Sequence, residues 1–277
     1  MSSIPTDFNN YSLELFNPLA GDSQYQDSDH LDLPLLVYLP GMDGTGKLFG
    51  DQARNLAPYF KLRCLKIPSN DLRDWQDLTK ATVNCLLREL NNLQQEKIYL
   101  CGESFGGCLA MSVALTIPNV VHKLVVINSA SSFNQQPILG LGINLIPLLP
   151  GWLHRNSALG MLPFLAELNR INPVNRRALL AAMKSLPQKV VSWRLAMLRD
   201  FALDSNLCQQ FIQETLIIAS KGDRLLPSVR EADKLANLFP NTKIEILPDS
   251  GHACLLETKI NLAEILLKYD LIGQKLA

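Results

Sequence analysis

The chain has 277 residues, of which 47% are hydrophobic and 19% charged, a composition typical of a globular protein with ample material for a core. Lysine plus arginine and aspartate plus glutamate are equal at 26 each, which argues against nucleic acid and against an anionic lipid surface as partners. The length fits one α/β domain that carries an insertion.

The N-terminal residues MSSIPTDFNNYSLELF lack the basic region and the long apolar core of a signal peptide. They also carry acidic residues where a transit peptide has arginines. No uninterrupted apolar run reaches the length of about 18 residues that suggests a membrane span. We therefore expect a soluble, cytoplasmic protein.

The six cysteines form no C-x-x-C pair, and several of them lie in apolar runs. Such cysteines are typical of reduced, buried thiols rather than of disulfides or metal ligands. We expect no metal site and no cofactor. The cysteines are Cys64, Cys85, Cys101, Cys108, Cys208 and Cys254.

The first half of the chain alternates strands and helices. Residues 11–16 resemble a strand, and Leu35–Leu39 is a short apolar run typical of a strand buried on both faces. The further predicted elements are helix 48–59, strand 62–67, helix 78–93, strand 98–101, a helix from 106 to about 117, and strand 121–128. This alternation predicts a mostly parallel sheet with helices on both faces.

The alternation stops after residue 128, and the segment 129–211 is helical or irregular with many prolines. Strands at 215–220 and 243–247, a helix at 228–238 and a helix at 253–269 then follow. We expect a core formed by residues 1–128 and 212–277, with 129–211 inserted as a helical cap.

The cap is unusually apolar, because Arg155 is its only formally charged residue between Pro137 and Ala166. Three roles stay open for this segment. It packs on the core, it lines a channel for an acyl chain, or it makes peripheral contact with a membrane.

Residues 102–106 read G-E-S-F-G and fit the pattern G-x-S-x-G, the nucleophile elbow. In this motif a serine lies on a sharp turn between a strand and a helix, and glycines avoid collisions with neighbouring backbone. A predicted strand precedes the motif and a predicted helix follows it. Ser104 is therefore the candidate nucleophile.

The loop Gly41–Lys47 after the second strand has two interpretations. It nearly matches a phosphate-binding P-loop, but Leu48 stands where that motif needs serine or threonine to hold magnesium. In the alternative, the backbone turns at Gly41 so that the amide of Met42 faces the active site as an oxyanion-hole donor.

A serine hydroxyl needs a general base to become a nucleophile. His252 follows the last predicted strand, whereas His30, His122 and His154 lie in the acidic N-terminal segment, at the start of a strand and in the cap. His252 is therefore the predicted base.

The base in turn needs a carboxylate that orients it. Asp223 directly follows strand 215–220 and gives the chain order Ser, Asp, His that the elbow fold requires. Asp249 competes for this role, but it lies on the same tight loop as His252 and is poorly placed to reach the ring.

The segments YLPGMDGTGKLF, RCLKIPSND and IYLCGESFGGCLA, together with K-G-D and G-H after later strands, resemble an α/β-hydrolase over nearly the whole chain. More narrowly, they resemble the hydrolase portion of phytyl ester synthase-like (esterase/lipase/thioesterase) proteins of plants and cyanobacteria. By this resemblance Ser104, Asp223 and His252 match the catalytic triad, and Met42 and Phe105 match the backbone donors of the oxyanion hole. The family is associated with the transfer of acyl groups to lipid alcohols.

One feature of the plant proteins is not matched. They continue into a second, acyltransferase-type domain with an H-x4-D motif, whereas Glu257 stands where His252 would need an aspartate. Transferase activity in this chain would therefore come from the serine site itself.

We expect a serine-dependent hydrolase or acyltransferase that acts on a lipid-like acyl ester or thioester, with water or a long-chain alcohol as the acceptor. Two other classes stay open. One is a non-catalytic ligand-binding protein with the same fold, and the other is a nucleotide-binding enzyme that uses Gly41–Lys47.

Overall fold

The computed structural model describes residues 12–22, 33–135 and 160–273. Within these ranges seven strands form one sheet in the order β1-β3-β2-β4-β5-β6-β7. Neighbouring strands pair in parallel except β1, which is antiparallel to β3. The strands are β1 (Glu14–Phe16), β2 (Leu35–Leu39), β3 (Lys61–Lys66), β4 (Ile98–Glu103), β5 (Val121–Ile127), β6 (Glu214–Ser220) and β7 (Thr242–Leu247).

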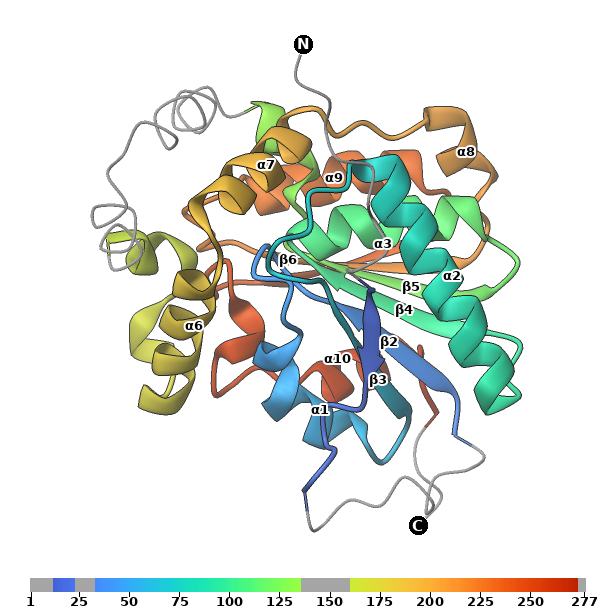
Figure 1. Ribbon diagram of the computed structural model, residues 1–277, viewed down its shortest axis with the longest axis horizontal. Coiled ribbons are helices and arrows are strands. Elements are labelled where there is room, and N and C mark those ends of the chain that lie inside the picture. The colour runs from blue at the N-terminus through green and yellow to red at the C-terminus, as the bar shows by residue number, and fades with distance from the viewer. Residues whose placement is uncertain (1–11, 23–32, 136–159, 274–277) are drawn as a thin grey trace.

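Helices cover both faces of this sheet (Figure 1). The labelled helices are α1 (Gly50–Leu56), α2 (Trp75–Leu93), α3 (Phe105–Thr116), α6 (Pro173–Ser185), α7 (Gln188–Arg199), α8 (Ser205–Gln210), α9 (Ser228–Leu238) and α10 (Leu262–Lys268), and residues 160–165 are helical as well. Apolar residues of α2, α3 and α9 form one buried layer, and those of α1 and α10 form the other. The predicted α/β-hydrolase architecture is confirmed.

The central strands are apolar on both faces because helices bury both. All five residues of β2 are buried, and the run LIIAS at the end of β6 is buried as well. Such a strand reads as a continuous apolar run, which is why its position could be predicted from the sequence.

The strands end at one common edge. In the pairing register Leu39 is opposite Gly102, Glu103 is opposite Ile127, and Ser220 is opposite Leu247. The loops that follow β2, β4, β5, β6 and β7 therefore meet at the carboxyl edge, where α/β proteins form their sites.

The prediction of one continuous helix over residues 253–269 is wrong. A 3₁₀ turn at Cys254–Leu256 is followed by irregular backbone, and α10 begins only at Leu262. The interruption occurs at Glu257, whose buried carboxylate accepts hydrogen bonds from the Gly251 amide at 2.8 Å and from Arg170 Nε at 2.5 Å. These partners are distant in sequence or outside the helix, so the helical pattern alone could not reveal them.

The other boundaries shift by a few residues. The predicted helix 48–59 is a 3₁₀ turn, Lys47–Phe49, followed by the shorter α1, whereas α2 begins three residues earlier than predicted because Asp74 caps it by accepting from the Asp77 amide. The segment between β5 and β6 contains α6, α7 and α8 among its described residues and no strand of the sheet.

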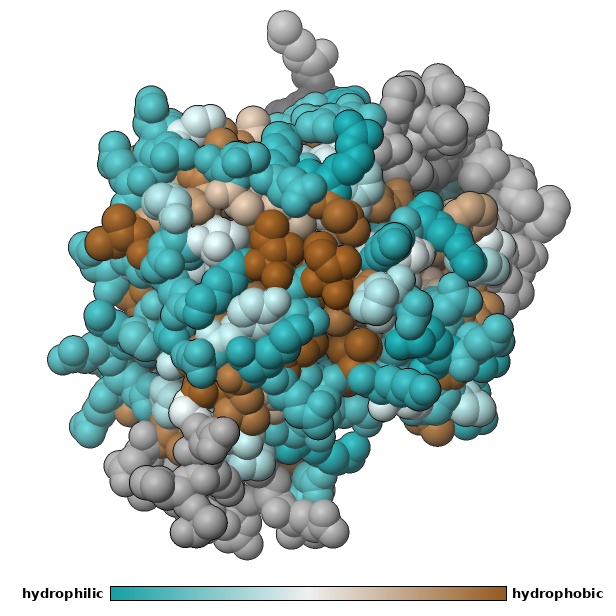
Figure 2. All heavy atoms as spheres, turned by 180° about the vertical axis from the view of Figure 1, so that it is seen from behind, coloured by the Kyte–Doolittle hydropathy of each residue, from teal (hydrophilic) through white to brown (hydrophobic). Residues whose placement is uncertain are grey.

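Several large apolar side chains remain exposed. On the face turned away from the view of Figure 1, apolar side chains gather near the middle with hydrophilic ones around them (Figure 2). The exposed large apolar residues are Leu87, Met161, Phe164, Val174, Trp193, Leu207, Ile212 and Ile246. Within the described ranges, no helix has the length and apolar character needed to cross a membrane.

Gln52 on α1 ties the start of α10 to the core. Its Nε2 donates to the carbonyls of Leu255 and Ile260 at 2.9 and 2.8 Å, and its Oε1 accepts from the Leu262 amide at 2.8 Å. The side chain is buried, so all three backbone groups depend on it in place of water.

We predict that Gln52→Leu lowers the free energy of unfolding by at least about 2 kcal/mol, because each buried polar group left unpaired costs about 1–3 kcal/mol. Urea unfolding measures this change. Gln210→Leu, at the exposed end of α8, is the matched control and should change stability by less than about 0.5 kcal/mol. Equal stability of the two variants would contradict the prediction.

Candidate active site

Ser104 lies on the turn between β4 and α3 with φ 55° and ψ −117°. Such backbone costs on the order of 1–3 kcal/mol for a residue with a side chain and persists only where the surroundings fix it. Here the Ser104 amide donates to the Ile127 carbonyl at 2.9 Å. The Ser104 carbonyl accepts from the amides of Gly107 and Ala130 at 3.0 and 3.2 Å. The turn is thus held from both β5 and α3.

Two glycines allow the backbone to approach itself closely at this turn. A Cβ on Gly102 would lie 2.2 Å from the Gly106 carbonyl oxygen, and a Cβ on Gly106 would lie 2.1 Å from the Leu39 carbonyl oxygen. No side chain fits at either position without moving β2, β4 or α3. The glycines of the motif are therefore required by packing.

The imidazole of His252 lies between Ser104 and Asp223. Its Nε2 is 2.9 Å from Ser104 Oγ, and its Nδ1 is 2.7 Å from Asp223 Oδ2. His252 is only 4% exposed. The structure therefore brings together the three side chains singled out from the sequence, from the loops after β4, β6 and β7.

Asp223 is itself held by several donors. Its Oδ1 accepts from the amides of Leu225 and Leu226 at 2.8 and 2.9 Å, and its Oδ2 accepts from the Ser228 hydroxyl. The Asp249 side chain is 74% exposed and is not hydrogen-bonded to His252 in the described structure. Of the two candidate carboxylates, Asp223 is the one that reaches the ring.

The pKa values of this pair shift in opposite directions. Burial would raise the pKa of Asp223, but the neighbouring His252 and the hydrogen bonds that Asp223 accepts outweigh it and lower that pKa. Burial would lower the pKa of His252, but the Asp223 carboxylate raises it above its ordinary value, with a further contribution from Glu103. The pair therefore favours a carboxylate beside a basic imidazole.

Glu103, next to the serine, was not singled out from the sequence. Its Oε2 accepts a hydrogen bond from the Tyr38 hydroxyl at 2.6 Å. Burial raises the pKa of Glu103 to about 6, although the Tyr38 hydrogen bond and His252 oppose the shift. Its position within the G-x-S-x-G motif was the only signal in the sequence that it lies near the site.

Asn128 was also missed. It has φ 41° at the end of β5, and its Nδ2 donates to the His252 carbonyl at 2.7 Å and to Ser220 Oγ at 2.9 Å. Its Oδ1 accepts from the Ser220 amide at 2.7 Å. One buried amide therefore ties the His252 loop to the ends of β5 and β6. An asparagine at a strand end, where left-handed backbone is tolerated, was the available signal.

The remaining histidines do not join the site within the described residues. His122 is exposed near the start of β5, and its ring centroid is 5.0 Å from that of Tyr99. His30 and His154 lie outside the described residues, as do positions 137–159 of the apolar cap segment.

The loop Gly41–Lys47 lies beside the serine, since a Cβ on Gly41 would be 3.8 Å from Ser104 Cβ. The Gly44 amide donates to the Gly41 carbonyl at 3.0 Å, and the Thr45 amide donates to Asp43 Oδ2 at 2.9 Å. A P-loop needs such amides free for phosphate, and the Asp43 carboxylate adds a charge that repels it. The loop geometry therefore argues against nucleotide binding.

The amides of Met42 and Phe105 differ from those of Gly44 and Thr45. Within the described residues neither donates a hydrogen bond to the protein. Met42 follows Gly41 on the loop, and Phe105 is the first residue of α3 after Ser104. Two unpaired donors therefore flank the serine, one from each loop.

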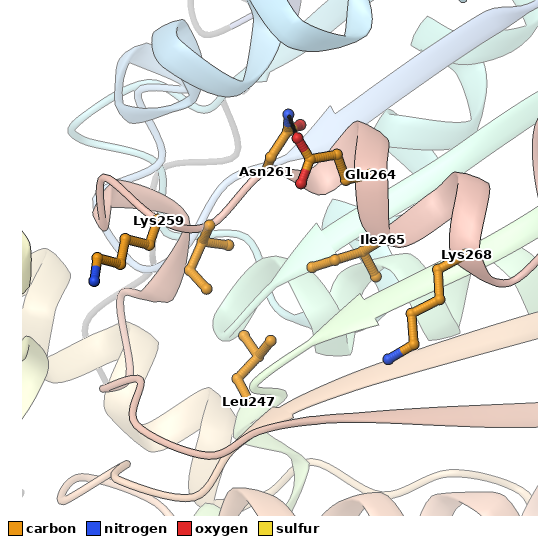
Figure 3. A pocket seen from close by; sticks show the side chains of 7 residues that line it. Leu247, Lys259, Asn261, Glu264, Ile265 and Lys268 are labelled. Carbon is orange, nitrogen blue, oxygen red and sulfur yellow. Dashed lines mark hydrogen bonds between the residues drawn. The ribbon is translucent and has the colours of Figure 1, made fainter.

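A surface hollow lies elsewhere, between the end of β7 and α10 (Figure 3). Its lining residues are Leu247, Lys259, Ile260, Asn261, Glu264, Ile265 and Lys268. None of the site residues described above is among them, so this hollow is separate from the serine site.

The cysteines take no part in a disulfide. All six are buried and unpaired, and burial raises the pKa of Cys101 and Cys108 far above the range in which a thiolate forms. The described residues contain no group of three or more potential metal ligands.

Comparison with known proteins places this chain in a family. The sequence profile of the alpha/beta hydrolase fold family matches residues 66–258. The chain belongs to the α/β-hydrolase family. Among solved structures it is similar to an esterase from Exiguobacterium antarcticum, with a TM-score of 0.73, 17% identity and coverage of 94% of each chain. At this identity the likeness shows the fold.

Two curated relatives from Arabidopsis thaliana are nearer in sequence. Phytyl ester synthase 1, chloroplastic, is 31% identical over an alignment of 258 positions, which covers 85% of this chain and 36% of the relative. Phytyl ester synthase 2, chloroplastic, is 32% identical over an alignment of 278 positions, which covers 91% of this chain and 39% of the relative. The chain is therefore phytyl ester synthase-like, and it spans less than two fifths of the length of these relatives.

We predict that Glu103→Gln lowers the pKa of His252, because the variant removes a negative charge that stabilises the imidazolium. Proton titration of the His252 ring by NMR measures this shift. Asp249→Asn, which removes an exposed charge from the His252 loop, is the control and should leave the pKa of His252 unchanged. An unchanged or raised pKa in Glu103→Gln would contradict the prediction.

The same substitution should affect stability with a defined sign. Because the pKa of Glu103 is raised in the folded protein, the stability it contributes is present at low pH and is lost as the pH rises through about 6. A change from pH 5 to pH 7 should therefore lower the free energy of unfolding less in Glu103→Gln than in the wild-type protein.

Proposed function

We propose that the protein is a serine-dependent acyl-ester or thioester hydrolase or acyltransferase that acts on a lipid-like substrate. The observation that carries this proposal is the chain of hydrogen bonds from Ser104 through His252 to Asp223, at 2.9 and 2.7 Å. A hydroxyl, an imidazole and a carboxylate in this order are the parts that acyl transfer through a covalent intermediate requires.

In the first step His252 Nε2 takes the Ser104 proton while Oγ attacks the substrate carbonyl carbon. The carbonyl π electrons move to oxygen and form a tetrahedral oxyanion. Asp223 stabilises the imidazolium through Nδ1, and the imidazolium then protonates the leaving alcohol or thiol as its bond to carbon breaks. An acyl-enzyme on Ser104 remains.

The amides of Met42 and Phe105 are proposed as the oxyanion-hole donors. Both flank Ser104, and neither is committed to another hydrogen bond within the described structure. One such donor contributes about 10²–10³ in rate in other enzymes of this type. Release of the acyl group repeats the two proton transfers with the acceptor in place of the serine.

The cap is proposed to be the segment 129–211, with the core formed by 1–128 and 212–277. In support, α6 and α7 lie together to one side of the sheet (Figure 1). Arg194 of α7 donates to the Met42 carbonyl beside the serine, so this segment borders the site. Exposed Met161, Phe164 and Trp193 also lie in it and offer apolar surface to an acyl chain.

The acceptor of the acyl group determines the class of reaction. Water makes the enzyme an esterase or thioesterase, and a long-chain alcohol makes it an acyltransferase. The names of the two plant relatives favour an ester-forming reaction. The proton transfers are the same in both cases.

We predict that Ser104→Ala abolishes the turnover of a p-nitrophenyl acyl ester and the labelling of the protein by a fluorophosphonate, while the Tm stays within a few degrees of wild type. Ser112→Ala, farther along α3, is the control and should retain both activities. Failure of the wild-type protein to be labelled at Ser104 would instead favour a non-catalytic ligand-binding protein.

We also predict that the products depend on the acceptor supplied. Incubation with acyl donors of several chain lengths, with and without a long-chain alcohol, is followed by mass spectrometry of the products. An alkyl ester that forms at the expense of free acid identifies transfer. If only free acid forms at every alcohol concentration, the enzyme is a hydrolase and the transferase proposal fails.

A further inference from the structure

Arg194 on α7 is the largest buried polar side chain near the site, with only 2% of the residue exposed. Within the described residues no carboxylate forms an ion pair with it, although Asp71 and Asp43 are near enough to favour its charge. An isolated buried charge is costly, so the contacts that hold this guanidinium require an explanation. These contacts are with residues beside Ser104.

The guanidinium contacts both residues proposed as oxyanion-hole donors. Its Nη1 donates to the Met42 carbonyl at 2.5 Å, and its Cζ lies 5.7 Å from the centre of the Phe105 ring. A cation over an aromatic face at this distance is attracted to it. One side chain from the cap therefore touches the loop after β2 and the first residue of α3.

The loop is shaped around this side chain. A Cβ on Gly44 would lie 2.8 Å from Arg194 Nη1, and Gly44 also has φ 70°. The second amino group, Nη2, donates to the Pro68 carbonyl at 3.4 Å. The guanidinium thus bridges the loop after β2 and the loop after β3.

Helix α7 has further attachments to the core. Trp193 Nε1 donates to the Arg73 carbonyl at 2.8 Å, and Trp75 Nε1 donates to the Met197 carbonyl at 2.6 Å. The Trp75 ring also stacks on that of Phe105, with centroids 4.8 Å apart. Because these contacts do not involve Arg194, α7 should stay in place when Arg194 is replaced.

We propose that Arg194 is a positioning residue for the oxyanion hole. Its bond to the Met42 carbonyl restricts the backbone rotation at Met42, and its position over the Phe105 ring restrains the start of α3. The two free amides on either side of Ser104 are thereby kept in one relative orientation, from which both can reach the same oxygen. This inference rests on the function proposed above.

Three variants separate this role from a general structural one. Arg194→Met removes the donors, Arg194→Lys keeps a charge but not the planar fork, and Arg194→Ala leaves space for an added guanidinium ion. Arg199→Ala is the matched control, because Arg199 lies on the same helix with half of its side chain exposed. Steady-state kinetics on an acyl ester are measured for each in the full chain.

For Arg194→Met we expect kcat to fall about 10-fold to 100-fold with KM changed less than about 3-fold, because the loss is confined to the transition state. Affinity for a boronic acid, which forms a tetrahedral adduct with the serine, should fall in proportion to kcat/KM. Arg194→Lys should be intermediate. Methylguanidinium should restore part of the activity of Arg194→Ala. Arg199→Ala should have wild-type activity without it.

Two results would overturn the inference. One is wild-type kcat and boronic-acid affinity in Arg194→Met. The other is a parallel loss of Tm, kcat and substrate affinity without rescue, which identifies Arg194 as a folding residue only. Failure of the proposed function itself is distinguishable, because the wild-type protein would then show neither turnover nor labelling of Ser104.

Discussion

The close contact between the backbone of the turn at Ser104 and the end of β2 is the constraint on which the site depends. Gly106 approaches the Leu39 carbonyl so closely that a Cβ would lie 2.1 Å from it. This approach fixes α3 against the sheet and forces Ser104 into left-handed backbone. The loops at the carboxyl ends of the neighbouring strands then bring His252 and Asp223 to the Ser104 hydroxyl.

The features that could be predicted from the sequence are those with local causes. Buried parallel strands are continuous apolar runs, and the glycines of the elbow are demanded by the turn itself. Because parallel strands end at one edge, a residue directly after a strand can be placed from its strand alone. Ser104, Asp223 and His252 all belong to this class, and the structure places His252 within hydrogen-bond distance of the other two.

The features that were missed have partners far away in the chain. The break before α10 depends on Arg170, which reaches Glu257 from 87 residues away, and the Met42 loop depends on Arg194, 152 residues away. Asn128 likewise binds the carbonyl of His252 across 124 residues. In each case a buried polar group needs a partner, and residue patterns do not reveal which distant group supplies it.

Charged side chains of both signs border the site. Carboxylates at Asp223 and Glu103 favour a protonated His252, while the guanidinium of Arg194 lies on the side of Met42 and Phe105. In the proposed first step, the proton that moves from Ser104 to the imidazole brings positive charge next to the Asp223 carboxylate. The negative charge develops on the substrate oxygen at the Met42 and Phe105 amides, which Arg194 is proposed to position. In this proposal the same charges serve every acyl transfer through Ser104. Under the proposed function, selection between water and an alcohol arises from shape and access, to which the proposed cap segment 129–211 contributes.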